Sequence, residues 1–281
     1  MIAFFHELMQ PEWKFLRHAI LVGALASLSL GIIGSIVVTR RISSLAGASA
    51  HAALGGVGVA LFMQRVFMFT GFTPMLGAAV GAVAAAILVG VINLYTKERE
   101  DTSINMVWAL FMSVGLLFMA GTPGVIDLQG YLFGNIILLD DSAITRTLIL
   151  DAIVLIPVIF FYNHILTMSF DATFAELRGI RVNILYLGLL ALTALTIVLL
   201  IDMVGIILVI ALLTLPAAAA GCFTRHLWSM MTLSSIFSCL SITAGLLISS
   251  RFDFPAGPII VVLACIIYVI GITICLRREM R

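Results

Sequence analysis

Long stretches without any charged residue alternate along the chain with short clusters of charge. Nine stretches of at least 19 residues contain no Asp, Glu, Lys or Arg. They cover residues 18–39, 42–64, 66–96, 102–126, 152–170, 182–201, 203–224, 226–250 and 254–276. A bilayer core about 30 Å thick needs about 20 helical residues to cross, and a charge at its centre costs about 2.5–3.5 kcal/mol. The pattern therefore predicts nine transmembrane helices.

One further apolar run, residues 128–139, has only 12 residues and is too short to cross a bilayer as a helix. A re-entrant or interfacial segment is the better interpretation. The nine long runs are continuously apolar, whereas the strands of a membrane β-barrel alternate apolar and polar residues. The predicted fold class is therefore all-α: a polytopic transmembrane helical bundle of about nine spanning helices plus one short re-entrant or interfacial segment.

Composition removes the soluble alternatives. Among 281 residues, 15 are Lys or Arg and 14 are Asp or Glu, which makes 10% of the chain charged, against about 25% in soluble domains. With a hydrophobic fraction of 62%, the chain has too little polar surface to cover a soluble core. A soluble enzyme, a disordered chain and a disulfide scaffold are excluded. The net charge of +1 gives no reason to expect a nucleic-acid partner.

The basic residues predict the orientation, because cytoplasmic loops are enriched in Lys and Arg. With nine spans, an outer N-terminus and a cytoplasmic C-terminus, most basic residues share the cytoplasmic side: Arg40, Arg41, Lys97, Arg99, Arg178, Arg181, Arg225, Arg277, Arg278 and Arg281. Arg65, Arg146 and Arg251 fall on the outer side. Asp151 and Asp202 fall near outer span ends, where we expect simple interfacial solvation, with a ligand role at the outer mouth as the alternative.

Motifs for catalysis are absent from the sequence. Neither of the two lysines, Lys14 and Lys97, belongs to a GxxxxGK[ST] phosphate loop. His6-Glu7 has no second histidine at the spacing of a zinc protease helix, and no GxSxG elbow exists. We therefore predict a membrane protein that moves, conducts or scaffolds, and not an enzyme with its own ATPase site.

His51 is the one ionisable side chain in the apolar run 42–64. On a helix it shares a face with Gly55 and Gly58, and that face has almost no side-chain bulk. Another helix or a substrate can approach the backbone there. Imidazole is a common ligand of zinc and iron, so one hypothesis is an intramembrane metal contact. A histidine hydrogen-bonded to a neighbouring helix is the other, and both stay open.

Small residues and one proline suggest further packing features. Gly77 and Gly81 form a GxxxG pair, for which we predict close helix packing. Pro216, in the run 203–224, removes a backbone donor, so a kink or a helix end is expected there. Such breaks border the substrate path in transporters, although ordinary helix bundles also tolerate them.

Segment 169–181 differs from the spans because it is polar, short and compatible with a helix. Phe170, Phe174 and Leu177 follow at i, i+4 and i+7 and form a narrow apolar face. Gly179 suits a C-terminal cap. In the predicted orientation the segment is cytoplasmic, either as a solvated loop helix or as a docking helix for a cytoplasmic partner.

Together these features resemble the permease subunits of ABC importers for zinc, manganese and iron. The order and spacing of several stretches carry the resemblance: Arg40-Arg41 followed by Ala50-His51-Ala52, Glu100-Asp101-Thr102, Tyr131-Leu132-Phe133-Gly134, Asp202 to Val209 leading to Leu215-Pro216-Ala217-Ala218, and Pro255-Ala256-Gly257-Pro258. They extend over most of the chain.

The resemblance implies a single transmembrane permease domain over residues 1–281 in a bacterial plasma (inner) membrane. It implies a second copy of the chain, cytoplasmic ATPase subunits that bind ATP, and an extracytoplasmic metal-binding protein. It also implies that no cofactor is bound permanently and that the transported species is a divalent metal. Residues 169–181 would contain the helix that couples to the ATPase, with Asp171, Ala175, Glu176 and Gly179 as coupling residues.

One position departs from the family pattern. Family members with a known metal gate carry an Asp four residues before the histidine that corresponds to His51, and this chain has Gly47 there. Loss of a hard oxygen ligand favours zinc over manganese. Import of manganese, iron or a metal chelate by the same class of permease is the alternative. A secondary transporter is disfavoured because it would need buried charged pairs for ion coupling.

Overall fold

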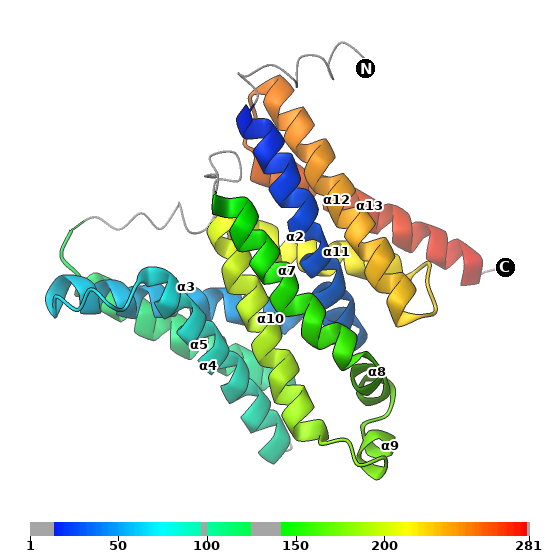
Figure 1. The fold of residues 1–281 in the computed structure, drawn as a ribbon, viewed down its shortest axis with the longest axis horizontal. Helices are drawn as coiled ribbons and strands as arrows, with labels where there is room; N and C mark the ends of the chain where they lie inside the picture. Colours follow the sequence, from blue (N-terminus) through cyan, green and yellow to red (C-terminus); the bar gives the residue numbers. More distant parts are fainter. Residues whose placement is uncertain (1–13, 97–99, 125–141, 280–281) are drawn as a thin grey trace. The chain divides into compact units, whose positions relative to one another are not determined.

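The computed structural model describes residues 14–96, 100–124 and 142–279. Every regular element in these ranges is a helix (Figure 1), which confirms the predicted all-α class. In chain order the helices are α2 (Lys14–Thr39), α3 (Ser44–Val66), α4 (Pro74–Tyr95), α5 (Glu100–Ala120), α7 (Ser142–Phe160), α8 (Tyr162–Phe170), α9 (Ala172–Leu177), α10 (Val182–Val204), α11 (Ile206–Gly221), α12 (Leu227–Phe252) and α13 (Ala256–Glu279).

Eight of the described helices are long and apolar enough to cross a bilayer, namely α2, α3, α4, α5, α7, α10, α12 and α13. The predicted run 203–224 gives the shorter α11 of 16 residues, about 24 Å long at 1.5 Å per residue. α11 starts late because Gly205, with φ of 85°, separates it from α10. The predicted short segment 128–139 lies outside the described residues.

The fifth span lies elsewhere than predicted. We expected residues 152–170, but α7 covers Ser142–Phe160 and the separate helix α8 follows it. α7 therefore contains Asp151, which we expected to be solvated at the interface. That expectation is wrong, because Asp151 is only 4% exposed and its carboxylate accepts a hydrogen bond from the Ser29 hydroxyl of α2. A buried acidic group needs such a donor.

Two compact units make up the fold. Among the described residues, the first unit combines 14–38, 142–156 and 203–279, and thus most of α2 and α7 with α11, α12 and α13. The second unit combines residues 39–96, 100–124 and 157–202, and thus α3, α4, α5, α8, α9 and nearly all of α10.

In the first unit, backbones approach closely at glycines. A Cβ added at Gly34 of α2 would meet the Leu213 carbonyl oxygen of α11. A Cβ at Gly245 of α12 would meet the Ile260 side chain of α13. Small residues let the two helix backbones come close together. In a bilayer, where the hydrophobic effect does not drive helices together, the dispersion contacts between such closely packed helices stabilise the fold.

In the second unit, α3 packs against both α4 and α5. Gly56 of α3 faces Gly77 and Gly81 of α4, and a Cβ at Gly56 would meet the Gly77 carbonyl oxygen. On a neighbouring face α3 meets α5, where Gly55 and Gly115 are in direct backbone contact. The arrangement of small residues on two faces of α3 is what places His51 within this three-helix packing.

Candidate metal contact and docking segment

His51 lies two turns into α3 and is half-buried. Its ring lies beside Trp108 of α5, with 5.3 Å between the ring centroids and 36° between the planes. The Nδ1 atom is buried and has no hydrogen-bond partner among the described residues. One nitrogen of His51 is therefore not used in a hydrogen bond within the described residues. A histidine that was hydrogen-bonded to a neighbouring helix through Nδ1 would have a partner at that atom.

Open space adjoins His51 on the N-terminal side. Gly47 lies one helical turn earlier on the same face, and a Cβ placed there would have no heavy atom within 4 Å beyond its chain neighbours and the nearby backbone of α3. The C-terminal side is closed, because added Cβ atoms at Gly55 and Gly58 would meet the carbonyl oxygens of Phe111 and Gly115. The face with little side-chain bulk that the sequence predicts is thus covered by α5 on the C-terminal side of His51. It is accessible only around Gly47.

The ligand set around His51 is incomplete in this part of the chain. The described residues hold no group of three or more His, Cys, Asp or Glu side chains close enough to share a metal ion. Trp108, which sequence reasoning missed, supplies a ring and no ligand atom to His51. A tryptophan within an apolar run gives no signal in the sequence that its ring will lie beside a histidine of another helix.

Pro216 belongs to the first unit and is buried within α11. Of the two outcomes expected there, a helix end does not occur, because α11 continues to Gly221. Proline removes only one hydrogen bond and the neighbouring turns persist.

The docking segment, residues 169–181, centres on the short helix α9. Asp171 begins it: its Oδ1 accepts a hydrogen bond of 2.9 Å from the Phe174 amide. Ala175 is fully buried. Gly179 ends the turn with φ of 79°, a conformation that glycine adopts without strain, and its amide donates to the Glu176 carbonyl at 2.8 Å.

The outer surface of the docking segment is apolar with a charged border. Phe170, Phe174 and Leu177 are 72%, 45% and 83% exposed. Glu176 is exposed, and the Arg178 guanidinium lies 4.9 Å from the Phe174 ring centroid. A mixed apolar and charged surface on a short capped helix suits contact with another protein.

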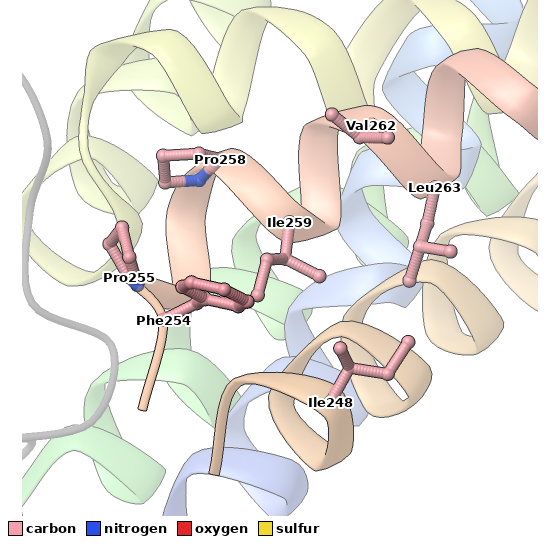
Figure 2. A pocket seen from close by; sticks show the side chains of 7 residues that line it. All are labelled: Ile248, Phe254, Pro255, Pro258, Ile259, Val262 and Leu263. Atoms are coloured by element: carbon pink, nitrogen blue, oxygen red, sulfur yellow. The ribbon is translucent and has the colours of Figure 1, made fainter. Parts of the chain in front are cut away.

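A hollow of about 410 Å³ lies in the first unit where α12 turns into α13 (Figure 2). Only apolar side chains line it: Ile248, Phe254, Pro255, Pro258, Ile259, Val262 and Leu263. These side chains offer no metal ligand, so this hollow has no part in the candidate metal contact.

Comparison with known proteins identifies the family. Residues 12–275 match the ABC 3 transport family, ABC-3. The chain is 36% identical over 255 residues to a Chlamydia pneumoniae protein named "Probable metal transport system membrane protein", covering 90% of this chain and 86% of that protein. It is 34% identical over 260 residues to the manganese transport system membrane protein MntC of Listeria monocytogenes, covering 92% and 90%.

A solved structure agrees with these relatives. PsaBC from Streptococcus pneumoniae in complex with Fab superposes with a TM-score of 0.81 at 30% identity, covering 96% of this chain and 95% of that one. The resemblance to permeases of metal-ion ABC importers is therefore confirmed at the level of the family. Seven of the eight long apolar helices in the described residues lie wholly inside the matched range, and the eighth, α13, begins inside it. The chain is a multi-pass membrane protein that belongs to the ABC 3 transport family.

Proposed function

We propose that this chain is the membrane permease of an ABC importer for a divalent metal ion. The observation that carries the proposal is His51: its Nδ1 is uncommitted and it stands beside open space at Gly47, inside an apolar helix of an ABC 3 family member. The Chlamydia and Listeria relatives are named for metal and manganese transport, which supports the same substrate class.

Zinc is the cargo that the residues favour. An imidazole without a carboxylate one turn away suits zinc better than manganese, which prefers oxygen ligands. Manganese is the second candidate, because the Listeria relative at 34% identity is named for it. Iron and metal chelates complete the alternatives. In each case the metal is cargo, and we expect no permanently bound cofactor.

Energy would come from a separate chain. No phosphate loop occurs in the sequence, so ATP would bind to a cytoplasmic ATPase subunit, and the docking segment with Asp171, Ala175, Glu176 and Gly179 would transmit its movement. An extracytoplasmic metal-binding protein would deliver the ion, and a second copy of the chain would complete the path. The whole chain, residues 1–281, would act as one permease domain.

The mechanism we propose is alternating access in the plasma membrane of a bacterium, with the N-terminus outside and the C-terminus in the cytoplasm. The metal-loaded binding protein docks outside, and ATP-driven closure of the ATPases moves the docking segment. The ion then passes His51, which offers one weak and replaceable ligand. Weak coordination suits transport, because a cargo that binds tightly would not leave.

The test is metal uptake by the reconstituted complex of permease, ATPase and binding protein, with zinc, manganese and iron in competition. Replacement of His51 by Ala should lower uptake at least about tenfold, which corresponds to a loss of about 1.4 kcal/mol, because the ion loses a ligand, while assembly with the ATPase stays intact. His226→Ala is the matched control, because His226 is exposed and its side chain makes no capping hydrogen bond. Full uptake by the His51→Ala complex would remove the metal contact from the proposal.

A further inference from the structure

Arg40, in the turn between α2 and α3, contacts both flanks of the docking segment. Its Nη1 donates a hydrogen bond of 2.9 Å to the carbonyl oxygen of Met168, near the end of α8. Its guanidinium carbon lies 5.4 Å from the ring centroid of Tyr186, in the first turns of α10. One side chain thus ties the residue just before segment 169–181 to the helix just after it.

The contacts suit the chemistry of a guanidinium. A cation near the last carbonyls of a helix interacts favourably with their partial negative charge. The planar guanidinium can donate through one edge while its face lies over an aromatic ring. Arg40 is half-buried, whereas Met168 and Tyr186 are 1% and 4% exposed, so these contacts are shielded from water.

The Tyr186 ring extends the connection to α4. The Asn93 side-chain amide donates a hydrogen bond of 3.3 Å to the Tyr186 hydroxyl. α4 in turn packs on α3 through Gly77, Gly81 and Gly56. The helix that carries His51 is therefore linked to the flanks of the docking segment by a continuous chain of contacts within the second unit.

The backbone after Arg40 is tightly folded. Arg41 has φ of 59°, and the Leu45 amide donates to the Ile42 carbonyl at 3.0 Å. Ile42 is 2% exposed, which anchors the turn. α3 then begins at Ser44, so this tight turn joins Arg40 directly to the start of the helix that carries His51.

We propose that Arg40 is the positioning residue that holds the docking segment in a fixed place relative to the helix carrying His51, so that movement of one is passed to the other. This role rests on the proposed function of segment 169–181 as the ATPase contact. We call the set of Arg40, the Met168 carbonyl, Tyr186 and Asn93 the Arg40 clamp. Without the clamp, the ATPase would move the docking segment while α3 and α4 stay behind.

The first experiment measures the clamp itself, by amide hydrogen exchange on the purified full-length chain. Arg40→Gln should speed exchange of amides 169–173 about tenfold, because one charge-assisted hydrogen bond that holds α8 is lost. Arg41→Gln is the matched control: Arg41 is the adjacent arginine, carries the same charge and is exposed. Equal exchange rates in the two variants would overturn the proposal, whether or not either variant assembles with an ATPase.

The second experiment measures metal ions imported per ATP hydrolysed by the reconstituted complex. Arg40→Gln should lower this ratio about tenfold with ATP hydrolysis largely retained, and Arg41→Gln should leave the ratio unchanged. Arg40→Lys should recover part of the ratio, because lysine keeps the charge but lacks the planar guanidinium. A purely structural role would lower uptake and hydrolysis together and leave the ratio unchanged, which would overturn the inference. If the unaltered complex imports no metal, the proposed function fails instead, and the exchange experiment still decides whether the clamp exists.

Discussion

Gly47 leaves the space one turn before His51 empty, at the position where the family resemblance leads us to expect an Asp. A carboxylate placed there would share the accessible face of α3 with the imidazole. Apart from its chain neighbours and the nearby backbone of α3, its Cβ would have no heavy atom within 4 Å, so the substitution is compatible with the packing. The choice of metal can therefore be tested at this residue without disturbing the fold.

Gly47→Asp should raise uptake of manganese relative to zinc by about tenfold, because a hard oxygen ligand suits manganese better than imidazole alone. The measurement is competitive uptake of the two metals by the reconstituted complex. Gly47→Asn, with the same size and no charge, is the control. Identical selectivity in the Asp, Asn and unaltered complexes would show that this position does not contact the ion.

Asp151 shows how one residue shifts a predicted element. The charge-free criterion excluded it from a span, yet it lies within α7 with its carboxylate bonded to Ser29. Its second oxygen, Oδ2, has no partner among the described residues. A sequence pattern cannot anticipate a hydrogen bond between residues 122 positions apart, and this bond is what makes an acidic residue tolerable in α7.

At the scale of elements, α9 is a helix of six residues, too short to be stable in isolation. It is held by its Asp171 cap, by the buried Ala175 and by the turn at Gly179. Leu177, which is 83% exposed, adds little to this framework. A substitution on this exposed surface can therefore test binding to a partner without changing the stability of the fold.

Leu177→Glu should uncouple the complex, because a charge on an apolar contact surface opposes desolvation on docking. Leu177 is 83% exposed, so the change in folding stability should stay within about 0.5 kcal/mol. The measurement is co-purification with the ATPase and ATP hydrolysis stimulated by the metal-loaded binding protein. Tyr95→Glu, at a residue 85% exposed at the end of α4, serves as control. Unchanged co-purification and stimulation would place the ATPase contact elsewhere.

The pairing of α3 with α5 changes the meaning of the glycine-rich face. From the sequence, His51, Gly55 and Gly58 formed one surface that either a helix or a substrate could approach. In the fold, α5 covers Gly55 and Gly58 and only the Gly47 end stays accessible. A metal path along α3 would therefore involve the part of the helix before Gly55.

At the scale of the whole molecule, the distribution of arginines predicts sidedness. Arg178 should be cytoplasmic and Arg251 extracytoplasmic, and both are exposed. In a background lacking Cys222, Cys239, Cys265 and Cys275, a thiol reagent that cannot cross the membrane should label Arg251→Cys in intact cells but label Arg178→Cys only after the cells are opened. The reverse pattern would invert the proposed topology, and labelling of both from outside would contradict the assumed number of crossings between them.

The amino-acid sequence by itself determined the class of the protein and most of its elements. Charge-free runs of about 20 residues have one stable solution in a bilayer, the hydrogen-bonded helix, and eight such helices are present in the described residues. The cap at Asp171 and the turn at Gly179 were also within reach of sequence reasoning, because capping depends on neighbours along the chain.

Only the tertiary structure decided which faces are covered and which side chains meet. It placed Asp151 inside α7 beside Ser29, closed the Gly55 and Gly58 end of the α3 face with α5, and brought Arg40 onto Met168 and Tyr186. In the sequence, Arg40 marks the cytoplasmic side and belongs to one of the stretches that carry the family resemblance, but nothing there indicates its contacts. These outcomes depend on contacts between residues far apart in the chain, where packing and hydrogen bonding in three dimensions outweigh the local pattern of apolar and charged positions.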